Sequence, residues 1–353
     1  MRYTFDPSVQ NREVVPMEFN KNSNREILQY AIGALLYMPG TNKKIVQKIL
    51  NKEYPDLKAM VLCLEDSIGD CSVLEAERSV KYILSKLYEA MNRKNNPLSI
   101  NELPLIFVRV REPEQMMRIA KACKKTMSVL TGFVWPKFDK SNANAYIRIF
   151  SIVRELVATP LYVMPIIESR AVMYKETRIE NLKFIENSLQ SITEYVLGIR
   201  VGGTDFSNLY SVRREIDESI WDVKVVSDAF CDIINIFGRN YVISGPVWEF
   251  FENPNKKEDR AWVDGLKKEL AADRRNGMVG KTSIHPSQLR VIQESLMVSY
   301  SAYQNAIETL GLTNQSLVGV QKSFNGNQMN EAKTHINWAR KTVCLARIYG
   351  VCN

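Results

Sequence analysis

The stretch VLGIRVGGTDFSNLY, residues 196–210, is an apolar run that ends abruptly at two glycines, a threonine and an aspartate. Glycine in a strand marks a place where a ligand or another backbone segment approaches closely. Asp205 follows directly, so its carboxylate is expected where that approach occurs. The stretch therefore predicts a buried strand that is followed at its carboxyl end by a functional carboxylate.

The same pattern recurs along the chain: an apolar run, a polar or Gly/Pro end, and then a helical pattern such as the apolar stripe of residues 74–91. Continuous rather than alternating hydrophobicity is typical of parallel strands buried on both faces. Eight such alternations predict an α/β fold, a (β/α)8 TIM barrel. A doubly wound open sheet competes, but its glycine-rich phosphate fingerprint is missing. The runs are residues 34–40, 59–66, 105–111, 132–138, 162–169, 196–205, 241–248 and 278–286.

The sequence predicts that the whole chain divides into three parts. Residues 1–30 are polar and predict an N-terminal arm or a short helix that leads into the first strand, residues 31–298 are expected to form the barrel domain, and residues 299–353 are expected to form a C-terminal helical extension. The last helix of this extension, near residues 330–349, is amphipathic and predicts packing on the barrel or on a neighbouring subunit.

Composition excludes several classes of protein. No apolar run of 18 residues and no secretory core are present, so we expect a cytoplasmic protein without a membrane partner. The six cysteines lack metal-site spacing and predict reduced thiols. The net charge is +8, but Lys and Arg are spread along helical segments beside Glu, without a long basic block. This pattern predicts a solvated surface and a phosphate-bearing small molecule rather than nucleic acid as a partner.

Charged side chains gather at the predicted strand ends, where the chemistry of such a barrel is located. Burying these charges without partners would be costly. Either they form ion pairs that close the barrel or they form a site, and their coincidence at successive strands favours a site. We expect Lys137 to bind substrate there. The charged residues at these ends are Glu65, Asp66, Arg109, Arg111, Lys137, Glu168, Asp205, Glu249 and His285.

Two of these carboxylates predict a metal site. Glu168 and Asp205 end neighbouring strands, so they can converge on one Mg²⁺ or Mn²⁺ ion, with water and substrate oxygens completing its shell. Arg109 offers a fixed fork for a carbonyl or enolate oxygen. A metal and an arginine on one oxygen would stabilise an enolate. Backbone N–H groups near Gly203 and Thr204, and of Asp205 itself, are expected to hold a substrate carboxylate.

Histidine is scarce. Only His285 and His335 occur, so a histidine base would have to be His285, whose place before a proline is equally compatible with a structural role. No GxSxG elbow, HExxH motif or Walker loop appears.

Seven segments, in order, resemble the motifs of the HpcH/HpaI aldolase and citrate lyase beta-subunit superfamily. The match spans residues 33–292. The resemblance implies a (β/α)8 barrel that forms a homo-oligomer and uses Mg²⁺ to cleave or form a carbon–carbon bond. Substrates there are 2-oxo acids, 3-hydroxyacyl-CoA thioesters or related compounds. The segments are LLYMPGTNKKIVQKI, LCLEDSIGD, FVRVRE, GFVWPKFD, MPIIES, GGTDFS and GKTSIHPSQLRVI.

By position, the resemblance also implies roles for individual residues. Glu168 and Asp205 match the metal ligands, and Arg109 matches the arginine on the enolate oxygen. Glu65 and Asp66 match the acidic pair that orders metal-bound water and neighbouring side chains.

The chain also departs from the family pattern. The arginine that usually opens the first strand is replaced by Gly33, and the acidic residue before the Leu-Glu-Asp motif is replaced by Cys63. Relatives that use acyl-CoA often supply a catalytic aspartate from a C-terminal lid, and here no aspartate follows Asp273. These departures resemble an atypical bacterial branch of the kind found with tellurite-resistance and stress genes.

We therefore predict a Mg²⁺-dependent lyase that acts through a pyruvate- or oxaloacetate-like enolate. Its partner would be a small carboxylate, with a CoA thioester or a phosphate ester as further options. The alternative is a barrel that keeps the metal but binds a nucleotide or phosphate ester without lyase turnover.

Overall fold

The computed structural model describes residues 1–11, 13–312 and 319–352. Its chain forms two compact units, one of Asn20–Ile292 and one that joins Met1–Phe19 to Gln293–Asn353. Residues 20–30, expected in the N-terminal arm, thus lie in the larger unit. The division of the chain into three parts at residues 30 and 298 stays a prediction.

Eight parallel strands of the larger unit form one sheet in the order β7-β6-β5-β4-β3-β2-β1-β8. A bridge between Gly245 and Lys281 joins the edge strands β7 and β8, which closes the sheet into a barrel. The predicted α/β TIM barrel is confirmed, and each strand lies inside its predicted apolar run. The strands are β1 (Ala34–Pro39), β2 (Ala59–Cys63), β3 (Leu105–Arg109), β4 (Gly132–Trp135), β5 (Tyr162–Ile167), β6 (Ile199–Val201), β7 (Ile243–Ser244) and β8 (Lys281–Ser283).

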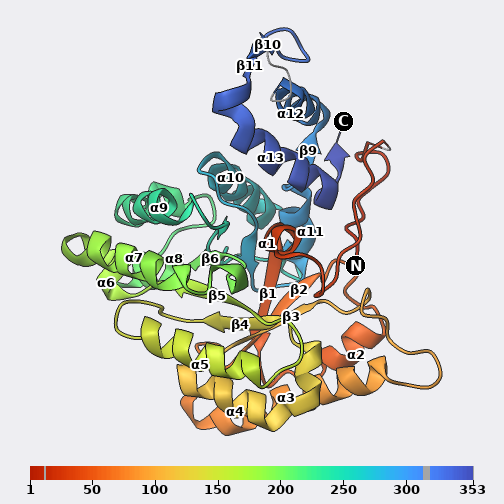
Figure 1. The fold of residues 1–353 in the computed structure, drawn as a ribbon, viewed down its shortest axis with the longest axis vertical. Helices are drawn as coiled ribbons and strands as arrows, with labels where there is room; N and C mark the ends of the chain where they lie inside the picture. The colour runs from red at the N-terminus through yellow and green to blue at the C-terminus, as the bar shows by residue number, and fades with distance from the viewer. Residues whose placement is uncertain (12, 313–318, 353) are drawn as a thin grey trace. The chain divides into compact units, whose positions relative to one another are not determined.

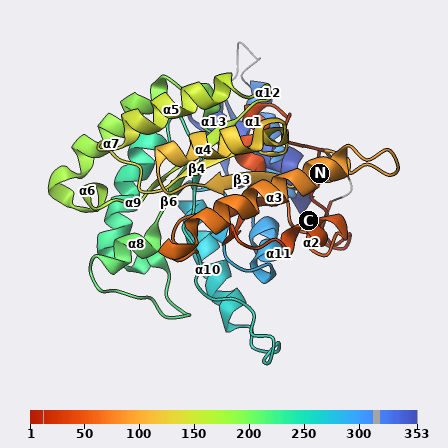
Figure 2. The same cartoon turned by 90° about the horizontal axis from the view of Figure 1, so that it is seen from below.

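Helices surround these strands, as Figures 1 and 2 show. Neighbours pack in chain order, α3 on α4, α4 on α5, α5 on α7 and α7 on α9. The helices are α1 (Arg25–Ala31), α2 (Ile45–Leu50), α3 (Val73–Met91), α4 (Pro113–Cys123), α5 (Ala143–Glu155), α6 (Arg170–Met173), α7 (Lys175–Gln190), α8 (Gly203–Asn208), α9 (Lys224–Phe237), α10 (Ala261–Arg275) and α11 (Ser287–Glu294).

Each strand presents one set of side chains to the helices and the other to the barrel interior. On β1, Leu36 and Met38 belong to the apolar core shared with the helices, whereas Tyr37 between them lines an interior cavity. Both faces are buried, which is why the runs are apolar without alternation. Polar residues at inward positions are therefore the exceptions that need a chemical reason.

An ion-pair cluster fixes the last strand to its helix. The fully buried Lys281 of β8 lies 2.7 Å from Glu269 and 2.6 Å from Asp273, both on α10. Removing one partner from such a buried ion-pair cluster strongly destabilises the fold, because it leaves an unpaired charge. Because Lys281 and Ser283 bond outward, Thr282 between them faces the interior.

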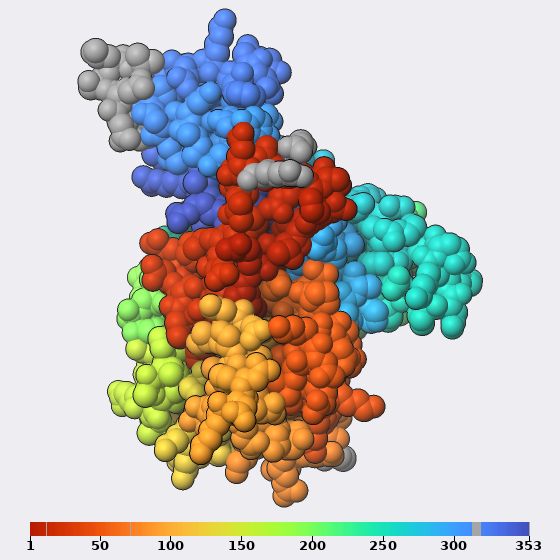
Figure 3. Space-filling model, turned by 90° about the vertical axis from the view of Figure 1, so that its right-hand side faces the viewer, coloured from red at the N-terminus to blue at the C-terminus, as the bar shows by residue number. Residues whose placement is uncertain are grey.

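The smaller unit brings the two ends of the chain together, and Figure 3 shows the N-terminal and C-terminal residues in contact. The Tyr3 ring lies 4.4 Å from that of Tyr349, and the Asn11 N–H donates to the Val351 carbonyl at 2.7 Å. Its elements are β9 (Val298–Ser299), α12 (Tyr300–Leu312), β10 (Val320–Lys322), β11 (Met329–Glu331), α13 (Ala332–Tyr349) and β12 (Val351–Cys352).

Among the helices that the structure describes, none has the length and apolar character needed to cross a membrane.

Candidate active site

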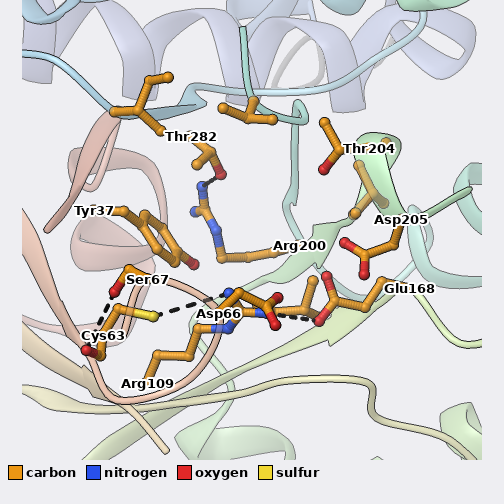
Figure 4. A pocket seen from close by; sticks show the side chains of 16 residues that line it. Tyr37, Cys63, Asp66, Ser67, Arg109, Glu168, Arg200, Thr204, Asp205 and Thr282 are labelled. Carbon is orange, nitrogen blue, oxygen red and sulfur yellow. Dashed lines mark hydrogen bonds and ion pairs between the residues drawn. The ribbon is translucent and has the colours of Figure 1, made fainter. Parts of the chain in front are cut away.

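A cavity of about 300 Å³ lies inside the larger unit at the carboxyl ends of the strands (Figure 4). Its volume is at the lower end of the range for small-molecule sites. Its walls come from β1, β2, β3, β5, β6 and β8 and from segments that follow strands, including Val247 after β7. Polar lining residues are Tyr37, Cys63, Asp66, Ser67, Arg109, Glu168, Arg200, Thr204, Asp205 and Thr282.

Arg109, the last residue of β3, is the centre of an ion-pair network. Its Nη2 lies 2.7 Å from Glu65, 2.9 Å from Glu168 and 3.3 Å from Asp66. Burial alone would lower the pKa of Arg109, but Glu168 and Glu65 raise it above its ordinary value. Nη1 reaches only the Cys63 sulfur, at 4.0 Å, and the buried Nε has no hydrogen-bond partner within the described residues. Arg109 thus keeps donor groups for a ligand.

Lys137 completes this network from the turn after β4. Its Nζ lies 2.5 Å from Glu65 and 3.4 Å from Asp66, and its backbone N–H donates to Glu168 at 3.0 Å. Burial raises the pKa of Glu65, whereas hydrogen bonding and the nearby cations hold the pKa of Asp66 below its usual value. Glu65 and Lys137 stand behind Asp66, outside the cavity lining.

Glu168 and Asp205 lie beside one another on the cavity wall (Figure 4). Burial, with Asp205 adding negative charge, raises the pKa of Glu168 to about 7. Burial and the charge of Asp66 likewise raise the pKa of Asp205. Both shifts mean that the charged carboxylates lack sufficient positive charge nearby, which a cation between them would supply.

The two glycines before Asp205 have a different cause from the expected one. A Cβ atom on Gly202 would overlap the side chain of Glu168. Gly203 begins α8 and packs on Pro246, 3.0 Å from where its own Cβ would be. The close approach predicted for this stretch is therefore made by a neighbouring carboxylate side chain.

The donor set fits Mg²⁺. Within the described residues, no group of three or more His, Cys, Asp or Glu side chains is arranged to hold a metal. Glu168 and Asp205 alone would serve, and Mg²⁺ characteristically takes one or two carboxylates and keeps several waters. Four carboxylates also gather around only two paired cations, and a divalent ion would balance this charge. The carboxylates are Glu65, Asp66, Glu168 and Asp205; the cations are Arg109 and Lys137.

Sequence reasoning missed Arg200, Tyr37 and Thr282, which lie together on the other side of the cavity (Figure 4). The signal for Arg200 was present in the sequence, since it is a single cation inside an apolar strand. Tyr37 and Thr282 carry no such signal, because aromatic and β-branched residues are ordinary in strands.

His285 is not among the residues that line the cavity. His285 stacks on Phe251 at 4.7 Å and its Nδ1 lies 2.8 Å from the Ser287 hydroxyl, while the cavity is lined by the preceding Ile284. Cys63, which does line the cavity, is a buried free thiol, and Cys231 is an exposed one.

No curated protein matches the sequence. Similar solved structures include a citrate lyase from Burkholderia xenovorans LB400, with a TM-score of 0.64 and 12% identity over 90% of this chain and 92% of that one. CitE from Mycobacterium tuberculosis, in complex with magnesium, acetoacetate and coenzyme A, has a TM-score of 0.55 and 16% identity over 89% and 97%. RipC from Yersinia pestis has a TM-score of 0.50 and 16% identity over 77% and 98%. At these sequence identities, the structural similarity shows that this chain shares its fold with these proteins.

The family follows from a different comparison. Residues 26–351 match the model of the C–C bond lyases of the TIM-barrel fold. The matched range includes the strand-end motifs described above. Because this match extends over most of the sequence, the chain belongs to the TIM-barrel family of carbon–carbon bond lyases.

Proposed function

We propose that this lyase is Mg²⁺-dependent and that it breaks or forms a carbon–carbon bond through the enolate of a pyruvate- or oxaloacetate-like 2-oxo acid. The observation that carries the proposal is the placement of Glu168 and Asp205 beside Arg109 in one cavity. In support, the similar CitE from Mycobacterium tuberculosis was crystallised with magnesium and acetoacetate.

Each residue contributes to this reaction in a definite way. Glu168 and Asp205 would hold Mg²⁺, which supplies Lewis-acid polarisation of the 2-oxo group when bound. Arg109 would direct its Nη1 and Nε donors, neither of which is bonded to a carboxylate in the described residues, at the oxygen that gains charge as the bond breaks. The first N–H groups of α8, at Gly203, Thr204 and Asp205, have no partner within the helix and would bind the substrate carboxylate.

The acidic pair and Lys137 would act through Arg109. Glu65 and Asp66 fix the guanidinium in its plane, and Lys137 balances their charge. Asp66 is the member of this group that reaches the cavity, so it would order water at the metal. Lys137 is a positioning residue in this arrangement, with its backbone N–H fixing Glu168.

Deuterium exchange at the methyl group of pyruvate tests the proposal without knowledge of the second substrate. An enzyme that stabilises the enolate should catalyse this exchange in heavy water only with Mg²⁺ present, as observed by proton NMR. Mn²⁺ is a second metal to test. Pyruvate that binds without exchange, with or without metal, would instead favour a barrel that binds its ligand without turnover.

Metal dependence is the first prediction. Glu168→Gln and Asp205→Asn should abolish Mg²⁺ binding in calorimetric titration with little loss of fold, because each removes one of two anionic ligands. Glu249→Gln is the control, since this carboxylate follows β7 in the chain but does not line the cavity. Unchanged Mg²⁺ affinity in either ligand variant would show that the assignment is wrong.

A further inference from the structure

Arg200 differs from the other arginines buried in the part of the chain that the structure describes. Arg109 pairs with Glu65, Asp66 and Glu168; Arg178 pairs with Asp228 and Asp232; and Arg214 pairs with Glu269. Arg200 is only 2% exposed and has no carboxylate partner among the described residues. An uncompensated buried charge is costly, so its retention calls for an anion that the chain itself does not supply.

The surroundings of Arg200 form a subsite with unused hydrogen-bonding groups. Its Nη2 donates to Thr282 Oγ1 at 2.5 Å, and its Cζ lies 5.8 Å from the centre of the Tyr37 ring. Arg200 Nε and Tyr37 Oη are both buried without a hydrogen-bond partner within the described residues. Three strands contribute these groups, β6, β8 and β1, so the subsite is part of the barrel itself.

This subsite shares its cavity with the proposed metal site. Arg200, Tyr37 and Thr282 lie on one side, and Glu168 and Asp205 lie on the other (Figure 4). A guanidinium group presents a planar fork that matches a carboxylate or a phosphate. One small molecule in a cavity of about 300 Å³ can therefore contact both sides.

We propose that Arg200, with Thr282 and Tyr37, binds a second anionic group of the substrate, so that the enzyme selects 2-oxo acids that carry a further carboxylate or phosphate-type group. The proposal rests on the proposed function for the 2-oxo acid end, and it adds the specificity of the other end. Arg200 then determines which substrate is accepted, whereas Arg109 and the metal ligands serve the reacting atoms.

The test compares ligands that differ in the distal group. Calorimetry with Mg²⁺ measures the affinity of pyruvate, of 2-oxoglutarate, which adds a carboxylate, and of 3-phosphonopyruvate, which adds a phosphonate. The parent protein should bind at least one of the doubly anionic probes about tenfold more tightly than pyruvate, because a charge-assisted hydrogen bond supplies this difference. Whichever of these two probes binds more tightly identifies the distal group as a carboxylate or as a phosphate-like group.

Arg200→Met should reduce this preference to about one, and Thr282→Val and Tyr37→Phe should reduce it in part. Arg213→Met, at an exposed arginine, is the matched control and should keep the preference. Melting temperatures verify that each variant folds, and Thr282→Val supplies the test if Arg200→Met does not. The proposal is overturned if the parent shows no preference, or if folded Arg200 variants weaken all three ligands equally, as a structural role would require.

Failure of the proposed function would look different. Succinate and inorganic phosphate, titrated without Mg²⁺, report on the Arg200 subsite alone. The anion subsite is supported if these anions bind the parent protein and bind Arg200→Met more weakly. If pyruvate does not bind in the presence of Mg²⁺ in the same experiments, the proposed enolate function is wrong.

Discussion

Arg109 holds a buried network together and also faces the cavity. Three carboxylates share its Nη2, while Nη1 and Nε remain available. The two hypotheses for this residue, a structural ion pair and an oxyanion partner, therefore describe different nitrogen atoms of one side chain. Its substitution should affect both stability and turnover.

We expect Arg109→Ala to lose about 3–5 kcal/mol of unfolding free energy, because buried carboxylates are left unpaired. Turnover should fall about 10²–10³-fold through loss of the oxyanion partner. Arg109→Lys should recover part of the stability but little of the turnover, since a point charge does not reproduce the fork. Denaturant titration and pyruvate exchange measure the two effects. A stable Ala variant with unaltered exchange would contradict both roles.

The pKa of Glu168 predicts a pH dependence whose sign is fixed. The folded-state pKa of about 7 lies above the ordinary value of 4.5, so the folded metal-free protein binds more protons than the unfolded chain between these values. Its stability should fall as pH rises through this window. Mg²⁺ requires the charged carboxylate, so the thermal stabilisation by Mg²⁺ should grow as pH rises through about 7.

Thermal melts with and without Mg²⁺ from about pH 5 to about pH 8 test this dependence. Glu168→Gln, which cannot titrate at this position, should flatten both trends. If Mg²⁺ raises the melting temperature equally at the two ends of this range, protons do not compete with Mg²⁺ for Glu168.

At the scale of elements, the junction between β6 and α8 determines where Glu168 can lie. The side chain of Glu168 occupies the space beside Gly202 that any Cβ would fill. Gly202→Ala should therefore displace this carboxylate and weaken Mg²⁺ binding about 10- to 100-fold, as disturbed support of metal ligands does.

Gly69→Ala is the matched control, because no atom lies within 4 Å of its would-be Cβ and its φ of −69° suits alanine. Calorimetric titration of Mg²⁺ compares the two variants. Equal affinities would mean that Glu168 tolerates a shift and that the glycine serves only local packing.

The strands were predictable from sequence because both of their faces are buried, so each appears as a continuous apolar run. The position of Glu168 and Asp205 in one cavity was predictable because each lies at the end of such a run, whereas their role as metal ligands stays a prediction. The cause of the glycines was not, since the side chain that fills the space beside Gly202 comes from the neighbouring strand. Arg200 was missed because only the structure shows that no carboxylate of the described chain reaches it.

At the scale of the whole molecule, the distribution of carboxylates limits the chemistry. Relatives that activate acetyl-CoA bring an aspartate from a C-terminal segment, and this chain has none after Asp273. That aspartate itself is buried against Lys281. The thioester methyl proton is less acidic than the methyl proton of a 2-oxo acid that a metal polarises, so its removal depends more strongly on a base placed beside it.

We therefore expect no malate or citramalate when acetyl-CoA is incubated with glyoxylate or pyruvate at saturating Mg²⁺. Mass spectrometry of the reaction mixture measures this, with pyruvate exchange as the positive control for active protein. Metal-dependent product that disappears in Glu331→Gln would show that a glutamate takes the place of the missing aspartate.

The joining of both chain ends in the smaller unit has a consequence during synthesis on the ribosome. Tyr3 and Phe19 are made long before Tyr349, on which Tyr3 packs. At about 5–20 residues per second, these aromatic side chains wait tens of seconds for that partner. β1 likewise waits for β8 before the barrel closes. The nascent chain thus carries exposed apolar surface from the synthesis of Tyr3 until that of Tyr349, and chaperone binding to residues 1–19 should end only when α13 has emerged.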